Sequence, residues 1–161
     1  MIDYERALTA LAAAGVSLVI VGGVAVTIHG SSYVTFDLDF CYARDPENLS
    51  RLTGALRPFN PRLRGSAPAG LPFRLDEGTL KAGMNFTLAT DLGDIDLLGE
   101  VAGVGVYAAA LAASQEVELF GATFRVLTLD ALIASKRAAG RPKDLMVLPE
   151  LEALREATQG G

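Results

Sequence analysis

Two aspartates separated by one residue, Asp37 and Asp39, are the pair with the clearest chemical potential in this sequence. They lie in a segment, residues 34–42, that alternates in part and predicts a strand with Val34, Phe36, Leu38 and Phe40 on its core face. Because successive side chains of a strand point to opposite faces, both carboxylates face the same way. Adjacent carboxylates repel each other, and a divalent cation relieves that repulsion. Hard oxygen ligands suit magnesium, so the pair predicts an Mg²⁺ site.

A second feature, Gly22-Gly23, comes shortly before the aspartates. Residues 17–21 predict a buried strand and residues 24–29 a short helix, which places the glycines at the junction. Glycine lets the backbone approach a phosphate closely, and a helix N-terminus offers free N–H groups. Ser31 or Ser32 could add a hydroxyl. A phosphate cradle followed by a metal-binding pair suggests nucleotide chemistry.

Further along the chain, residues 84–90 and 94–98 predict a hairpin joined by the turn at residues 91–93. Asp94 and Asp96 share a face of its second strand. Asp96 lies inside the strand between two apolar residues. We expect Asp94, at the turn, to point to solvent.

Positive charge gathers in residues 135–144, where Lys136, Arg137, Arg141 and Lys143 fall within eight residues and Asp144 follows. The segment begins on one predicted helix and ends at the start of the next. These bases could bind phosphates, or they could stabilise the helix C-terminus through its dipole. Residues 48–75 contain five arginines and no acid, which is typical of either a polyanion contact or a solvated surface.

Helices and short strands alternate irregularly along the rest of the chain. Helices are predicted from Asp3 to Gly15, from Asp45 to Leu56, over residues 105–114, over residues 128–139 and from Pro142 onward, with a hairpin at residues 116–127 and a surface loop at residues 57–72. This order predicts an α/β or α+β fold with a small mixed twisted sheet. The length favours a single domain, residues 1–161, with its core in residues 1–127 and C-terminal helices in residues 128–157.

The bulk composition limits the possible settings of the protein. A net charge of -5 argues against a generic, charge-driven nucleic-acid binder, although not against a local basic site. Cys41 is the single cysteine, so a packed thiol and a reducing cytoplasm are expected. The longest apolar stretch, residues 16–28, is too short for a membrane helix, and the first residues do not form a signal peptide. We therefore expect a cytoplasmic protein without membrane contact.

Taken together, these motifs resemble the signature of the nucleotidyltransferase superfamily, most of all its minimal and toxin–antitoxin-associated bacterial members of AbiEii-like type. Their common form is close to GGxAvxxHGxxRxTxDxD, and the matching residues here are Gly22, Gly23, Ala25, His29, Gly30, Thr35, Asp37 and Asp39. Residues 136–144 are similar to the K-x(4)-R-x-K-D segment of the same proteins. One departure is Tyr33, which stands where many relatives carry arginine.

The resemblance implies a nucleotidyltransferase fold in which Asp37, Asp39 and Asp96 bind two Mg²⁺ ions and carry the catalysis. It implies nucleotide contacts from Gly22, Gly23, Ser31 and Lys136, supported by Arg141, Lys143 and Asp144. The reaction would move a nucleoside monophosphate from an NTP such as ATP to a hydroxyl of RNA, for example tRNA, or of a protein. A small-molecule acceptor such as an antibiotic remains possible, and so does a cognate toxin or antitoxin partner.

Two alternatives stay open at the level of sequence. The Tyr33 departure would also suit a non-catalytic nucleotide- or partner-binding module on the same fold. His29, the single histidine, could contact substrate, but a structural place between a short helix and the sheet is the simpler interpretation.

Overall fold

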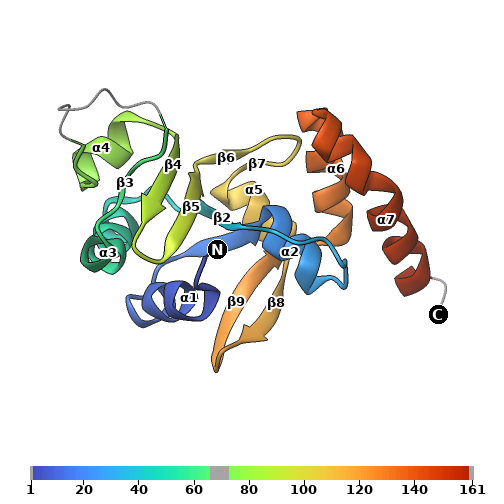
Figure 1. Ribbon diagram of the computed structural model, residues 1–161, viewed down its shortest axis with the longest axis horizontal. Coiled ribbons are helices and arrows are strands. Elements are labelled where there is room, and N and C mark those ends of the chain that lie inside the picture. The colour runs from blue at the N-terminus through green and yellow to red at the C-terminus, as the bar shows by residue number, and fades with distance from the viewer. Residues whose placement is uncertain (1, 66–72, 160–161) are drawn as a thin grey trace.

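A mixed sheet of seven strands forms the centre of the protein, which we describe from a computed structural model covering residues 2–65 and 73–159 (Figure 1). Its strands are β1 (Leu18–Val21), β2 (Asp37–Tyr42), β3 (Arg62–Leu63), β4 (Asn85–Thr90), β5 (Gly93–Leu98), β8 (Ser114–Leu119) and β9 (Ala122–Leu127). They run in the order β3-β4-β5-β2-β1-β9-β8. A separate two-stranded ribbon joins β6 (Glu100–Val101) to β7 (Gly105–Val106). The predicted mixed α/β architecture is confirmed.

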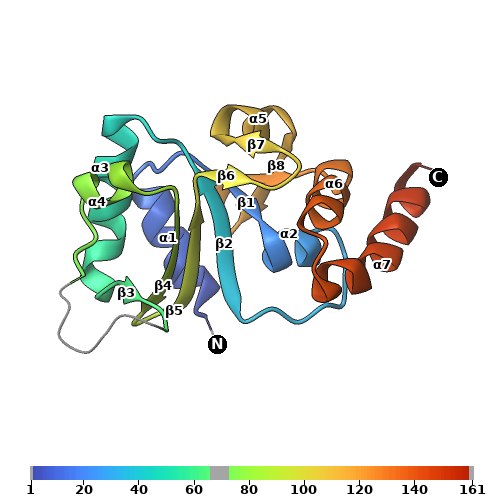
Figure 2. The ribbon, with the colours of Figure 1, turned by 90° about the horizontal axis from the view of Figure 1, so that it is seen from above.

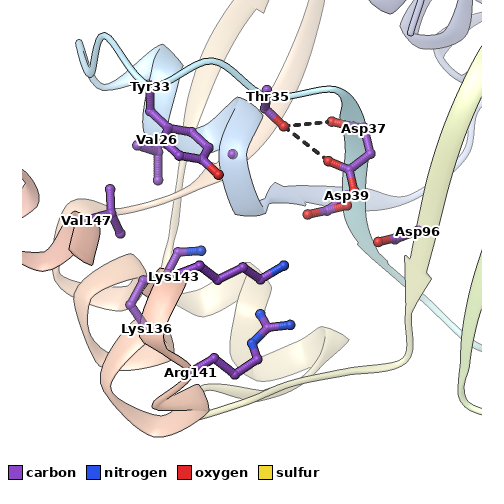
Figure 3. A pocket seen from close by; sticks show the side chains of 11 residues that line it. Val26, Tyr33, Thr35, Asp37, Asp39, Asp96, Lys136, Arg141, Lys143 and Val147 are labelled. Atoms are coloured by element: carbon purple, nitrogen blue, oxygen red, sulfur yellow. Dashed lines mark hydrogen bonds between the residues drawn. The ribbon is translucent and has the colours of Figure 1, made fainter. Parts of the chain in front are cut away.

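The pairing of β2 decides where the functional groups lie. β2 runs antiparallel to β1 on one side and parallel to β5 on the other. Two of its side chains, Leu38 and Phe40, are fully buried. They pack into the main core together with Ile20 and Ile95. Asp37 and Asp39 consequently project from the opposite face of β2 (Figure 3).

Most helices lie in two groups on either side of the sheet (Figures 1 and 2). The first group is α1 (Tyr4–Ala13), α3 (Pro46–Leu56) and α4 (Glu77–Ala82), and the second is α2 (Gly22–Ile28), α6 (Leu129–Ala139) and α7 (Pro142–Gln159). A short helix, α5 (Tyr107–Ala112), packs near β1, and a 3-10 turn, η1 (Arg57–Phe59), follows α3. None of the described helices is long and apolar enough to cross a lipid bilayer.

Helix ends follow the capping residues that the sequence predicts. The Asp3 and Asp45 side chains accept hydrogen bonds from the first turns of α1 and α3. The Thr128 side chain does the same for α6, and Gly140 ends α6 in the left-handed conformation. Pro142 then starts α7, so the turn that carries Arg141 is fixed between two helix ends.

The strand that carries Asp37 and Asp39 begins later than the sequence predicts. β2 begins at Asp37, and the side chains of Val34 and Phe36, which we expected in the core, are 63% and 64% exposed. The reason lies in the neighbouring strands: the β5 ladder begins at the pair Asp37–Asp94 and the β1 ladder at Asp39, so residues 34–36 have no strand to pair with.

Two further segments differ from expectation. The predicted helix at residues 105–114 is shorter, because β7 takes its first two residues and β8 begins at Ser114. The predicted loop at residues 57–72 contains η1 and β3, while residues 66–72 lie outside the described part of the chain.

Candidate active site

Three carboxylates come together where β2 and β5 lie side by side. In the parallel register of these strands Asp37 is opposite Asp94 and Asp39 is opposite Asp96. Because both strands present these side chains on one face, Asp96 stands next to Asp39 (Figure 3). One carboxylate oxygen from each of Asp37, Asp39 and Asp96 lies within 4.8 Å of the others.

Asp39 lies in an environment that disfavours its charged form. Burial, followed by the charges of Asp37 and Asp96, raises the pKa of Asp39 from 3.8 to about 8, and the ammonium of Lys136 only partly opposes this. Its Oδ1 atom is buried and has no hydrogen-bond partner among the described residues. A buried, unpartnered carboxylate oxygen is costly, so the site as built favours a bound cation.

The paired glycines make room for this cluster. Gly22 adopts φ +65°, which favours glycine, and a Cβ placed on it would lie 2.9 Å from Cγ of Asp39. A Cβ on Gly23 would lie 2.6 Å from the Thr35 side chain. The hydroxyl of Thr35 lies 3.1 Å from Oδ1 of Asp37, to which it donates (Figure 3). The glycines therefore let the first turn of α2 pack directly on the residues that carry and orient the carboxylates.

The first helix also holds the loop that leads into β2. The hydroxyl of Tyr4 on α1 donates to the backbone carbonyl of Thr35 at 2.9 Å. This contact fixes the strand's approach even though residues 34–36 have no ladder partner.

Three basic side chains, which we call the basic wall, line a cavity together with the three carboxylates. Lys136 from α6, Arg141 from the turn and Lys143 from α7 line this cavity together with Asp37, Asp39 and Asp96 (Figure 3). The wall is held by Asp144, whose side chain is 1% exposed. Its oxygens lie 3.3 Å from Nζ of Lys136 and 2.6 Å from Nε of Arg141.

The ionisation of Asp144 follows from these contacts. Burial pushes the pKa of Asp144 upward, but hydrogen bonds from Arg141 and the charge of Lys136 outweigh burial and leave the pKa below its ordinary value. Asp144 therefore stays anionic and fixes two of the three cations. Among the described residues Lys143 has no carboxylate within ion-pair distance, so its charge is available to a ligand.

Several residues predicted from sequence lie outside this cavity. Ser31 is 6% exposed, and its hydroxyl accepts a hydrogen bond from the backbone N–H of Tyr33. Gly22 borders a second cavity, which Asp39 and Asp144 also line. His29 places Nε2 at 2.7 Å from the carbonyl oxygen of Leu127, which is a structural contact. Cys41 is fully buried, and burial raises the pKa of its thiol to about 11.

Two kinds of residue at the site were missed by sequence reasoning. Tyr33, Val26 and Val147 form an apolar end of the cavity, away from the carboxylates (Figure 3). Arg64, from the arginine-rich stretch, forms an ion pair with Asp96. The Tyr33 departure from the motif was a usable signal, whereas nothing in the sequence distinguished Arg64 from the other four arginines.

We compared the sequence and the fold with known proteins. No family model and no curated protein matches the sequence. Solved structures do match: a candidate nucleotidyltransferase from Thermotoga maritima, TM1012, has 17% identity and a TM-score of 0.54, covering 100% of this chain and 97% of that one. The antibiotic-resistance factor ANT(2″)-Ia, in its solution structure, has 16% identity and a TM-score of 0.56, covering 98% and 89%.

This chain has the nucleotidyltransferase fold. A crystal structure of ANT(2″)-Ia in complex with adenylyl-2″-tobramycin gives the same TM-score of 0.56 at 16% identity, over 98% of this chain and 95% of that chain. At these identities the likeness establishes the fold, and the AbiEii-like subtype stays a prediction.

Proposed function

We propose that the protein is a divalent-metal-dependent nucleotidyltransferase that moves a nucleoside monophosphate from an NTP to an acceptor hydroxyl. One observation carries the proposal: three carboxylates and three cationic side chains line one cavity on a nucleotidyltransferase fold. Carboxylates gathered on one wall suit metal ions, and cations on the opposite wall suit a triphosphate.

The donor set fits magnesium. Asp37, Asp39 and Asp96 supply hard oxygen ligands, and the unpartnered Oδ1 of Asp39 is an acceptor with no other use among the described residues. We propose two Mg²⁺ ions held by these three residues. When bound, the ions would neutralise phosphate charge and lower the pKa of the attacking hydroxyl.

The remaining roles fall to the side chains of the cavity. Lys136, Arg141 and Lys143 bind and orient the triphosphate, with Asp144 fixing the first two. Gly23 borders the cavity and lets the phosphates approach the backbone. The acceptor oxygen forms a bond to the α-phosphorus while the bond to the bridging oxygen breaks, and pyrophosphate leaves with that electron pair. The acceptor proton passes to a carboxylate, for which Asp96 is our choice. Such transfer depends mostly on positioning and electrostatic stabilisation.

The acceptor and the biological setting are further parts of the proposal. An RNA such as tRNA, or a protein, follows from the resemblance to toxin–antitoxin members, as do a cognate toxin or antitoxin partner and a cytoplasmic location. A small-molecule acceptor gains support from the fold neighbour whose crystal structure contains adenylyl-2″-tobramycin.

Binding of nucleotide tests the proposal before any acceptor is known. Thermal unfolding is measured with each NTP, with and without Mg²⁺, for the wild type and for Asp37→Ala/Asp39→Ala. A ligand that binds only the folded state stabilises it by about 2.7 kcal/mol at a hundredfold excess over its Kd. We expect a shift that requires both Mg²⁺ and the aspartates, and labelled nucleotide then identifies the acceptor.

The outcome also separates catalysis from the non-catalytic binding module. A nucleotide shift that is independent of Mg²⁺ and of the aspartates would favour that module. The absence of any shift with all NTPs would contradict the proposed enzyme and a nucleotide-binding module, and would leave the partner-binding form of that module.

A further inference from the structure

Among residues 2–65 and 73–159, Arg64 is the one cation that pairs with the carboxylate cluster from outside the proposed nucleotide cavity. Its Nη2 atom lies 2.6 Å from Oδ1 of Asp96, and its Nη1 atom lies 3.5 Å from Oδ2 of Asp94. Its backbone N–H donates to the carbonyl of Thr87 on β4 at 2.9 Å, which ties the end of β3 to the sheet. A guanidinium that binds two carboxylates of one strand face is held in a defined orientation.

The burial of this contact distinguishes it from an ordinary surface ion pair. The side chains of Arg64 and Asp96 are 30% and 18% exposed. By contrast, Arg62, two residues earlier, pairs with Asp91 at 3.5 Å with both side chains about half exposed, at 57% and 48%. The shorter and more buried pair has the geometry of a charge-assisted hydrogen bond that constrains its partner.

Sheet order places Arg64 on the far side of Asp96 from the other two aspartates. β3 and β4 lie on one flank of β5, and β2 lies on the other. Asp96 therefore receives Arg64 from the β3 side and faces Asp39 on the β2 side. Arg64 is also absent from the residues that line the cavity between the carboxylates and the basic wall. Arg64 therefore reaches Asp96 from outside that cavity.

We propose that Arg64 is a positioning residue for the third carboxylate: it holds one oxygen of Asp96 and thereby presents the other to the metal shared with Asp37 and Asp39. This inference rests on the proposed function, because it concerns the same metal site. Partners that orient a metal ligand in this way typically contribute 10- to 100-fold to metal affinity. An arginine that instead competed with the metal for Asp96 would lower the affinity.

The two roles predict opposite changes in metal affinity when Arg64 is removed. A metal titration measures that change without requiring catalytic activity. Mn²⁺ binding to the full-length protein is measured by electron paramagnetic resonance for the wild type, Arg64→Ala, Arg64→Lys and Arg62→Ala. We expect Arg64→Ala to weaken Mn²⁺ binding by about 10-fold or more. Arg62→Ala, the matched control two residues earlier, should bind Mn²⁺ like the wild type. Arg64→Lys keeps the charge but loses the fork, so its affinity should lie in between.

Each remaining outcome is decisive. Unchanged or tighter Mn²⁺ binding by Arg64→Ala overturns the inference while leaving the metal site intact. If the wild type itself shows no Mn²⁺ binding that Asp39→Asn abolishes, the proposed metal-dependent function fails, and the role of Arg64 fails with it. Circular dichroism in EDTA establishes that each variant is folded, and if Arg64→Ala is not, the comparison of Arg64→Lys with the wild type decides by the same sign.

Discussion

Replacing Asp39 by asparagine should stabilise the metal-free protein, although it removes a residue that we place at the centre of the active site. Asp39 sits beside two other carboxylates, and one of its oxygens is buried without a hydrogen-bond partner. Burial and these neighbours raise its pKa from 3.8 to about 8. Asparagine has nearly the same shape but carries no charge, so the repulsion disappears.

The size of the effect follows from the pKa difference. A carboxyl with a higher pKa in the folded state than in the unfolded state binds its proton more tightly when folded, so stability falls as pH rises between the two values. Each pH unit in that window costs about 1.4 kcal/mol. From pH 5 to pH 7 the wild type should therefore lose up to about 3 kcal/mol relative to Asp39→Asn.

Urea unfolding followed by circular dichroism in EDTA, at pH 5, 6 and 7, measures this difference directly. The control is Asp130→Asn on α6, which removes an aspartate whose side chain is 69% exposed. Its stability relative to the wild type should not change with pH in this window. A constant difference between Asp39→Asn and the wild type across the three pH values would refute the assignment of Asp39 as the buried, cation-seeking carboxylate.

The remaining predictions concern the walls of the site. Gly22→Ala should destabilise the protein by more than about 1 kcal/mol in urea unfolding, because it strains a positive φ and crowds Asp39. The control is Gly54→Ala, in open space on α3, which should stabilise the protein by about 0.5–1 kcal/mol. Asp144→Ala should cost about 3–5 kcal/mol in the same assay, since it leaves Lys136 without its buried partner. Lys143→Ala should leave stability unchanged yet weaken NTP binding about tenfold in a calorimetric titration, because the charge it removes has no carboxylate partner among the described residues.

Local sequence signals were sufficient for the parts of the fold in which short-range physics decides. Asp3, Asp45 and Thr128 cap helices as predicted, because a capping side chain binds the backbone three residues away. The placement of Asp96 inside the second strand of a hairpin also followed from local pattern. Its position beside Asp39 did not, since the parallel pairing of β2 with β5 is a long-range choice that the sequence expresses only through the family resemblance.

The structure differs from the sequence-based expectations where long-range contacts decide the outcome. Val34 and Phe36 alternate as a buried strand would, yet neither β1 nor β5 extends far enough to pair with them. Ser31 stays a predicted phosphate contact, and in the structure its hydroxyl accepts a hydrogen bond from the backbone N–H of Tyr33. Arg64 belongs to a stretch for which a polyanion contact and a solvated surface were both open, and only the order of the strands reveals that it reaches Asp96.

That arrangement changes what the arginine-rich stretch says about the acceptor. From sequence its five arginines mildly favoured a polyanion, but Arg51, Arg62 and Arg64 bind carboxylates of the protein itself. The paired carboxylates offset part of the positive charge that these arginines would otherwise present to phosphates. The segment leading from α2 into β2 instead exposes Tyr33, Val34 and Phe36, with Tyr33 at the rim of the cavity. Contacts to an acceptor in this region would therefore depend on apolar and aromatic surface more than on charge.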